Sequence, residues 1–192
     1  MANPQPAVAT RDPLSAERIV AAALELMDRE GMAALSMRKL GARLSVQAMS
    51  LYGYFPNKDA LLTAASNALF AKIQTPAPEI DVFDGLRAVM LSFYQLVEEH
   101  RSIVDLLFNA PSAPALAGRG EADRGALRSV GFGEDAAAAL ATLVSFTVGS
   151  MHQGRNKTPQ QRRTDFEFGL DIVLAGLRLE ASRRAKNPPT RG

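Results

Sequence analysis

The chain contains no cysteine, only two histidines and almost no strand-like alternation of apolar and polar residues. Without cysteine it cannot form disulfides, thiolate metal sites or a cysteine nucleophile. No apolar run approaches the roughly 18 residues of a transmembrane helix, so we expect no membrane span. Residues 1–13 lack the basic and apolar regions of a signal peptide, and we expect them to form a flexible arm on a cytoplasmic protein.

The same absences argue against an enzyme. A helical enzyme needs a nucleophile with a base, or an acid–base pair. The sequence has no clustered carboxylates, and neither histidine has a partner at a useful spacing. We therefore expect no catalytic residues, no metal and no cofactor.

Positive charge is present, but it is concentrated in two places. The net charge is only +2, yet residues 31–58 and 181–192 each hold basic residues and no acidic one. The rest of the chain has 14 basic and 20 acidic residues. Local basic patches of this kind suit contact with a polyanion, although two solvated surfaces would give the same pattern.

Helical periodicity recurs along the whole chain and predicts an all-α fold of about nine helices. Ser15 and Gly31 are the expected cap and stop of the first helix. Residues 110–126 are rich in proline and glycine, so any helix there should be weak until about Ala126. Residues 156–163 are interpreted as a polar loop that precedes the last helix.

Two short helices joined by a tight turn, between longer helices, are typical of a helix-turn-helix module. Its second helix, residues 48–54, would enter the major groove of DNA. Leu51 and Phe55 would anchor that helix to the first two helices. The side chains expected to contact DNA are Arg38, Gln47, Ala48, Met49, Ser50, Tyr52, Tyr54 and Lys58.

These residues suit different parts of a DNA surface. A tyrosine is flat, rigid and carries one donor, so Tyr52 and Tyr54 could stack on sugar and bond a phosphate. Lys58 adds charge at a helix N-terminus, where anions bind readily. Gln47 is a poor cap and could reach a base edge, commonly that of adenine. Packing between helices is the alternative for the aromatic residues, above all for Phe55.

Several motifs in residues 15–62 occur at fixed spacings. They are A-x-x-L after the cap, G-x-x-A-L-S-M-R-x-L, L-Y-x-x-F and N-K-x-x-L-L. This segment resembles the N-terminal domain of the TetR family of transcriptional regulators. The remaining residues are similar, more loosely, to the subgroup closest to the tetracycline repressor. Ser45, Gln47 and Gly53 depart from the family pattern, which affects the operator sequence rather than the fold.

The resemblance implies a division of the chain and a function. Residues 14–60 would form the helix-turn-helix domain, residues 61–186 a larger helical ligand-binding and dimerisation domain, and residues 187–192 a tail. The protein would be a repressor that binds a palindromic double-stranded DNA operator as a homodimer. A small apolar or amphipathic effector would release it. A constitutive or architectural DNA-binding protein without an effector is the alternative.

Two stripes at helical spacing support the homodimer that the resemblance implies. One stripe has small side chains and the other larger apolar ones, although an intramolecular core would use part of either. The expected interface residues are Ala137, Ala141, Ser145, Gly149, Phe166, Leu170, Val173, Leu174 and Leu177.

The central helices would surround a small-molecule pocket, and such pockets are mostly apolar with a few placed polar groups. Ordinary core packing is an equal alternative for each lining residue. His100 ends a helix and is expected to cap it or to face water. The expected lining consists of Phe70, Met90, Phe93, Tyr94, Val97, Leu107, Phe108, Phe146, Thr147, Ser150, Met151 and His152.

Overall fold

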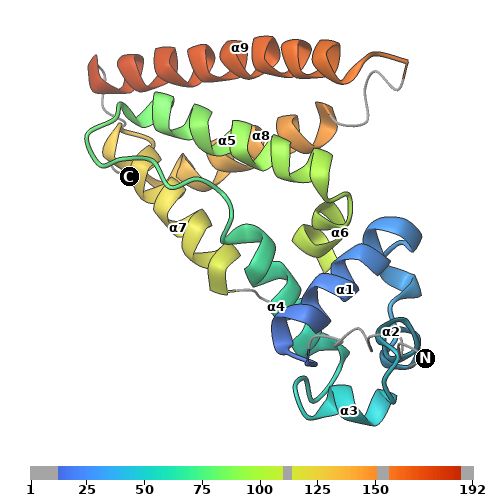
Figure 1. Ribbon diagram of the computed structural model, residues 1–192. Coiled ribbons are helices and arrows are strands. Elements are labelled where there is room, and N and C mark those ends of the chain that lie inside the picture. Colours follow the sequence, from blue (N-terminus) through green and yellow to red (C-terminus); the bar gives the residue numbers. More distant parts are fainter. Residues whose placement is uncertain (1–12, 110–113, 151–155, 187–192) are drawn as a thin grey trace, which may run out of the picture.

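The computed structural model describes residues 13–109, 114–150 and 156–186. Within those ranges the chain has nine α-helices, two short 3-10 helices and no strand, which confirms the predicted all-α fold (Figure 1). None of the described helices is long and apolar enough to cross a membrane.

The first helix, α1 (Ala16–Glu30), has the ends that its sequence predicts. The Ser15 hydroxyl accepts a hydrogen bond from the Arg18 backbone N–H at 3.2 Å. Gly31 ends the helix with φ +83°, a conformation that favours glycine. The buried side of α1 presents Ile19, Ala23, Leu26 and Met27 to the core. A short 3-10 helix, η1 (Met32–Ala34), then leads to the next element.

The helices α2 (Met37–Leu44) and α3 (Ala48–Tyr52) approach each other closely. A Cβ atom on Gly41 would lie 2.9 Å from the Val46 carbonyl oxygen and 3.1 Å from the Ala48 nitrogen. Ser45 makes the turn between them in the left-handed region, at φ 59° and ψ 39°. The contact at Gly41 and the turn at Ser45 together fix the direction in which α3 points.

The helix α4 (Lys58–Phe70) runs from the α3 end of the molecule toward its centre (Figure 1). The Asn57 side chain caps it by accepting from the Ala60 backbone N–H at 2.8 Å. Its buried residues pack against α1 at one end and against α6 and α7 further along. This helix therefore belongs physically to both halves of the chain.

The remaining helices form the larger part of the molecule. They are α5 (Val82–Glu99), α6 (Ser102–Asn109), α7 (Pro114–Ser129), α8 (Ala136–Ser150) and α9 (Pro159–Lys186), with the 3-10 helix η2 (Gly133–Asp135) before α8. The helix α9 lies across α5 and α8 at the opposite end from α3 (Figure 1). The ion pair Arg162–Glu98 joins the start of α9 to the end of α5, and the ion pair Arg178–Asp81 joins the last part of α9 to the N-cap of α5. These two helices are therefore antiparallel.

Two of the predicted boundaries were wrong. The helix α7 begins at Pro114 rather than near Ala126, and α9 begins at Pro159 rather than at Thr164. Proline is well tolerated in the first turn of a helix, because its missing N–H would have no partner there. In α9 the preceding Thr158 hydroxyl also accepts from the Gln161 backbone N–H at 3.2 Å, as a helix cap does.

A single cluster of buried apolar side chains extends from Ile19 in α1 to Ala181 in α9. Where α5 meets α9, the Tyr94 and Phe166 rings stack with centroids 4.1 Å apart and an interplanar angle of 11°. The helix-turn-helix end and the larger helical part therefore share one apolar core.

Candidate nucleic-acid interface

The helix α3 has one buried and one exposed side. Leu51 is fully buried and Phe55 nearly so, which confirms both as anchors. Met49 is 75% exposed, and no charged residue occurs from 45 to 57. We use the name "α3 face" for the exposed residues of α3 and its N-cap that the sequence predicted to contact DNA: Gln47, Met49, Ser50 and Tyr52. Ala48, also predicted there, is half-buried against α2.

Basic side chains flank the α3 face, but two of them are already paired. Lys39 pairs with Glu30, and Arg43 pairs with Glu25 at 2.5 Å. Arg38 is exposed and has no hydrogen-bond or ion-pair partner among the described residues. The basic patch that the sequence suggests therefore leaves fewer cations for an external polyanion than its composition indicates.

Lys58 and Tyr54 lie near the α3 face and make contacts within the chain. The Lys58 ammonium donates to the Met32 carbonyl oxygen at 3.4 Å. The Tyr54 hydroxyl donates to the Leu14 carbonyl oxygen at 2.7 Å, which ties the segment after α3 to the start of α1. The Tyr54 donor is therefore occupied in this structure, whereas half of its side chain stays exposed.

A carboxylate of α1 joins the DNA end of the molecule to the hinge between α5 and α6. One Asp28 oxygen lies 2.8 Å from Nδ1 of His100, and the other accepts from the Ser102 backbone N–H at 2.9 Å. We call these three groups the Asp28 junction. As expected, His100 caps its own helix: it ends α5, and its backbone N–H donates to the Leu96 carbonyl oxygen at 2.8 Å. The sequence did not predict that Asp28 of another element would bind its ring.

No local pattern in the sequence predicts this junction. Asp28 is 72 positions from His100 and 74 from Ser102, so no periodic pattern connects them. The only hint is an acidic residue in the last turn of α1, where a helix dipole disfavours negative charge. The bond to the first turn of α6 places the same charge at a favourable helix end.

The residues predicted to line a pocket are mostly buried, but one is not. Phe108 is 66% exposed, so it does not line a cavity in this structure; Ile103 and Leu106 occupy the inner side of α6 instead. Met151 and His152 lie outside the described residues. The half-buried members are Leu107, Phe146 and Ser150, and the buried members are Phe70, Met90, Phe93, Tyr94, Val97 and Thr147.

Several of these residues already make ring-stacking or hydrogen-bond contacts within the chain. Tyr94 and Phe146 both stack on Phe166, and the Thr147 hydroxyl donates to the Leu143 carbonyl oxygen at 2.8 Å. Burial raises the pKa of the Tyr94 phenol, and the Glu98 carboxylate adds to the rise. Tyr94 is therefore a neutral phenol at physiological pH, suited to donating a hydrogen bond at the edge of an apolar core.

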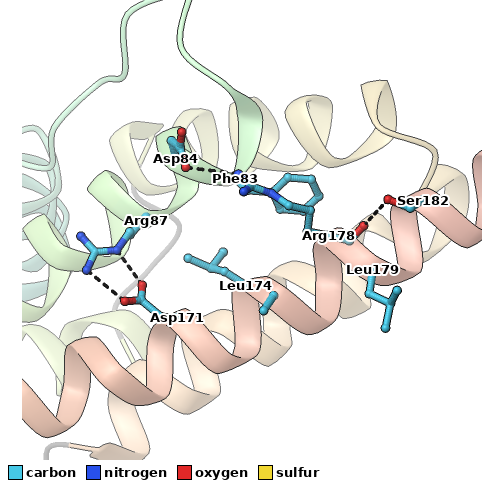
Figure 2. Close-up of a pocket in the computed structure, with 9 residues that line it drawn as sticks. Phe83, Asp84, Arg87, Asp171, Leu174, Arg178, Leu179 and Ser182 are labelled. Carbon is cyan, nitrogen blue, oxygen red and sulfur yellow. Dashed lines mark hydrogen bonds and ion pairs between the residues drawn. The ribbon is translucent and has the colours of Figure 1, made fainter.

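A cavity of about 540 Å³ lies elsewhere, between the start of α5 and the face of α9 (Figure 2). Ion pairs frame it: Arg87 binds Asp171 at 2.6 Å, and Arg178 binds Asp81 at 2.6 Å while lying over the Phe83 ring. Its lining residues are Phe83, Asp84, Arg87, Asp171, Leu174, Ala175, Arg178, Leu179 and Ser182. Both arginines of this cavity are therefore engaged in ion pairs between α5 and α9.

The helix α9 has apolar residues on two opposite sides, and the interface residues predicted on this helix lie on the inner side. Phe166, Leu170 and Leu174 are buried in the chain's own core, so they cannot meet a second copy; this part of the prediction was wrong. Val173 and Leu177 are half-buried and pack against the same core. The exposed side carries an apolar set that we call the α9 stripe: Phe168, Ile172 and Leu179, each more than half exposed.

The small residues of α8 lie where the sequence placed them. Ala137, Ala141, Ser145 and Gly149 are all exposed. They form a surface along which another helix could approach closely.

Comparison with known proteins places this geometry in a family. Residues 19–65 match the family described as "Bacterial regulatory proteins, tetR family". The class E tetracycline repressor protein of Escherichia coli is 31% identical over 202 residues, which cover 91% of this chain and 96% of that protein. The chain belongs to the TetR family. An HTH-type transcriptional regulator of Saccharopolyspora erythraea is 34% identical, and the match covers 78% of this TetR-family chain but only 64% of that relative.

Solved structures agree with this assignment. A substituted TetR from Acinetobacter baumannii AYE in complex with minocycline is 31% identical, with a TM-score of 0.71 over 88% of this chain and 99% of that one. BioQ with its double-stranded DNA operator is 25% identical, with a TM-score of 0.68 over 87% and 99%. This TetR-family protein is thus a helix-turn-helix transcriptional regulator rather than an enzyme.

Proposed function

We propose that this protein is a repressor that binds a palindromic operator as a homodimer and leaves it when a small molecule binds. The observation that carries the proposal is the α3 face, an exposed and uncharged helix surface held rigidly at one end of a TetR-family chain. Residues 14–60 would supply DNA binding, and residues 61–186 would supply effector binding and dimerisation.

In this proposal the contacts to DNA divide into two kinds. Gln47, Met49 and Ser50 would face base edges, because they lie on the exposed side of α3. Arg38, Tyr52 and Lys58 would contact phosphates and set the register without reading the sequence. The operator-bound structure of BioQ supports this docking for a protein of the same fold.

A homodimer would explain the apolar surface of α9. Two recognition helices can occupy successive major grooves only when they lie one helical turn apart, about 34 Å. The α9 stripe and the exposed small residues of α8 would together have to form a self-complementary surface, and two copies of it would build a bundle of four helices. The interface would then use Phe168, Ile172 and Leu179 in place of the buried residues first expected.

The effector is proposed to bind within the buried helices of the larger domain. The minocycline complex of a relative supports a small-molecule ligand, and Phe93, Tyr94 and Thr147 offer apolar surface with hydroxyl groups. Displacement there could reach the DNA end by two routes: α4, and the Asp28 junction at the start of α6. A coupling of about 1–3 kcal/mol, or 5- to 150-fold in operator affinity, is typical of such regulators.

Selection from a random pool of duplexes tests DNA binding directly. We expect enrichment of a near-palindrome, bound by two chains. Enrichment of a site without two-fold symmetry, or binding of one chain, would contradict the proposed homodimer.

The effector is tested by thermal-shift screening of small molecules, followed by titration of each hit with and without the selected duplex. Reciprocity requires the operator to change effector affinity by the same factor as the effector changes operator affinity. Equal affinities in both titrations would identify the alternative, a constitutive or architectural DNA-binding protein.

A further inference from the structure

We infer that Met49 reads the C5-methyl group of thymine, so that each operator half-site contains one A·T pair recognised by an apolar contact. This inference rests on the proposed function and names the chemistry of its DNA contact. It concerns one side chain at the centre of the α3 face.

The composition of the α3 face limits how it can read DNA. Arginine or lysine on guanine is the commonest specific contact, and acidic side chains accept from cytosine. Neither type occurs between residues 45 and 57. The lysine and one arginine of α2 are held by Glu30 and Glu25, which removes them further from base reading.

The exposed side of α3 carries the apolar side chain of Met49 and no charged side chain. Met49 is 75% exposed and is the most exposed large apolar side chain among the described residues. Leu51, two positions later, is fully buried, so the backbone of α3 cannot rotate to bury Met49 instead. The tight contact of Gly41 with Val46 and Ala48 holds the same orientation from the other side.

The chemistry of the two partners is complementary. In the major groove only thymine presents an apolar group, its C5-methyl, and apolar side chains contact it. A methionine side chain is unbranched and polarisable, so it can adjust to a methyl group without a fixed hydrogen-bond geometry. Covering both groups removes from water an apolar surface that the free protein leaves exposed.

Uracil provides the direct test, because it removes the methyl group and leaves base pairing and phosphates unchanged. Starting from the duplex selected by the wild-type chain, each symmetry-related pair of thymines is replaced by uracil in turn. Loss of one buried methyl contact should weaken the affinity of the protein for the duplex about fourfold, so loss of the contact in both half-sites should weaken it about fifteenfold. We expect this loss at one pair of positions.

Three variants assign the contact to Met49. Met49→Ala should bind the thymine and uracil duplexes equally, whereas Met49→Leu should still distinguish them. Ser50→Ala changes a neighbouring residue that also faces base edges; whatever it does to overall affinity, it should keep the full ratio of thymine-duplex to uracil-duplex binding. Thermal unfolding of each variant checks that the fold is retained, and the exposure of both positions predicts little change.

The possible failures are distinguishable. If a duplex is selected but uracil has no effect at any position, the Met49 inference is wrong and the proposed function stands. If Met49→Ala keeps the wild-type dependence, or Ser50→Ala loses it, another residue reads the methyl group and the inference is also wrong. If no duplex is enriched, the proposed function and the inference fail together.

Discussion

The α3 face and the α9 stripe both expose apolar side chains, but they rest on very different supports. The helix α3 has five residues and is held by one fully buried leucine, a close glycine contact and a left-handed turn. The helix α9 has 28 residues and is held along its length by a buried side and by ion pairs to α5.

The difference indicates what each surface can bind. A helix as short as α3 buries little area, so a partner there must add attraction from flanking charges such as Arg38 and Lys58. The stripe on α9 covers a long helix and can bury a large apolar area against a surface of the same kind. One end is suited to a polyanion, and the other is suited to a second copy of the chain.

The largest expected effect would come from a charge placed on the α9 stripe. In Ile172→Asp a carboxylate would have to be buried unpaired at the proposed interface, which is strongly unfavourable. We expect the homodimer to dissociate and operator affinity to fall by about 100- to 10,000-fold, because the two half-site contacts lose their linkage. Sedimentation and operator titration measure both changes.

Gln160→Asp is the matched control, since position 160 is exposed on the same helix but lies outside the stripe. That variant should remain dimeric and should bind the operator normally. A dimeric Ile172→Asp variant would show that the chain associates through another surface.

The second effect separates the two apolar sides of α9. Phe166→Ala removes a buried ring that stacks on Tyr94, and it should lower the free energy of unfolding by about 3–5 kcal/mol. Phe168→Ala changes an exposed ring two positions away and should alter it by less than about 0.5 kcal/mol within one chain.

Both substitutions should be made in the Ile172→Asp background, so that association does not contribute to unfolding. Chemical denaturation followed by circular dichroism gives the comparison. Similar losses for the two variants would mean that the assignment of the inner and outer sides is incorrect.

The third effect concerns the connection between the two ends. Asp28→Ala leaves the Ser102 N–H and the His100 ring without their partner, and the loss should destabilise the fold by about 1–3 kcal/mol. Glu99→Ala removes a nearby exposed carboxylate whose one hydrogen bond within the described part of the chain is to Gln95, and it should have little effect. An Asp28→Ala variant as stable as the Glu99→Ala variant would show that the junction contributes nothing to stability.

The smallest effect is expected from Lys58. If its ammonium contacts a phosphate, Lys58→Ala should reduce the salt slope of operator binding by about 0.9 per half-site, without changing the selected sequence. Lys72→Ala, just beyond the far end of α4, should leave the slope unchanged. A slope that is the same in both variants would remove Lys58 from the phosphate contacts.

The sequence predicted best where the determining interactions are local. Ser15 accepts from a backbone N–H three residues ahead, so the predicted start of α1 was correct. Ser36 and Asn57 make the same local contact at the starts of α2 and α4. Leu51 and Phe55 were recognised as anchors because the positions around them fit only one orientation of a short helix.

The errors arose where local patterns allow two outcomes. A proline can end a helix or begin one, and Pro114 and Pro159 both begin helices here. Periodicity located one apolar stripe on α9 but could not decide whether it would meet the chain's own core or a second copy. The Asp28 junction joins residues more than 70 positions apart, and nothing near Asp28 in the sequence indicates its partners.

The Asp28 junction also has a consequence for the way the protein folds. The first turn of α6 receives its cap from α1, so that turn cannot be fully stabilised until the N-terminal helices are in place. The apolar cluster also runs through both parts, so the side chains around the junction cannot pack fully until those helices are in place. The helix-turn-helix end and the larger helical part should therefore melt in one cooperative transition, with equal calorimetric and van't Hoff enthalpies, rather than as two independent units.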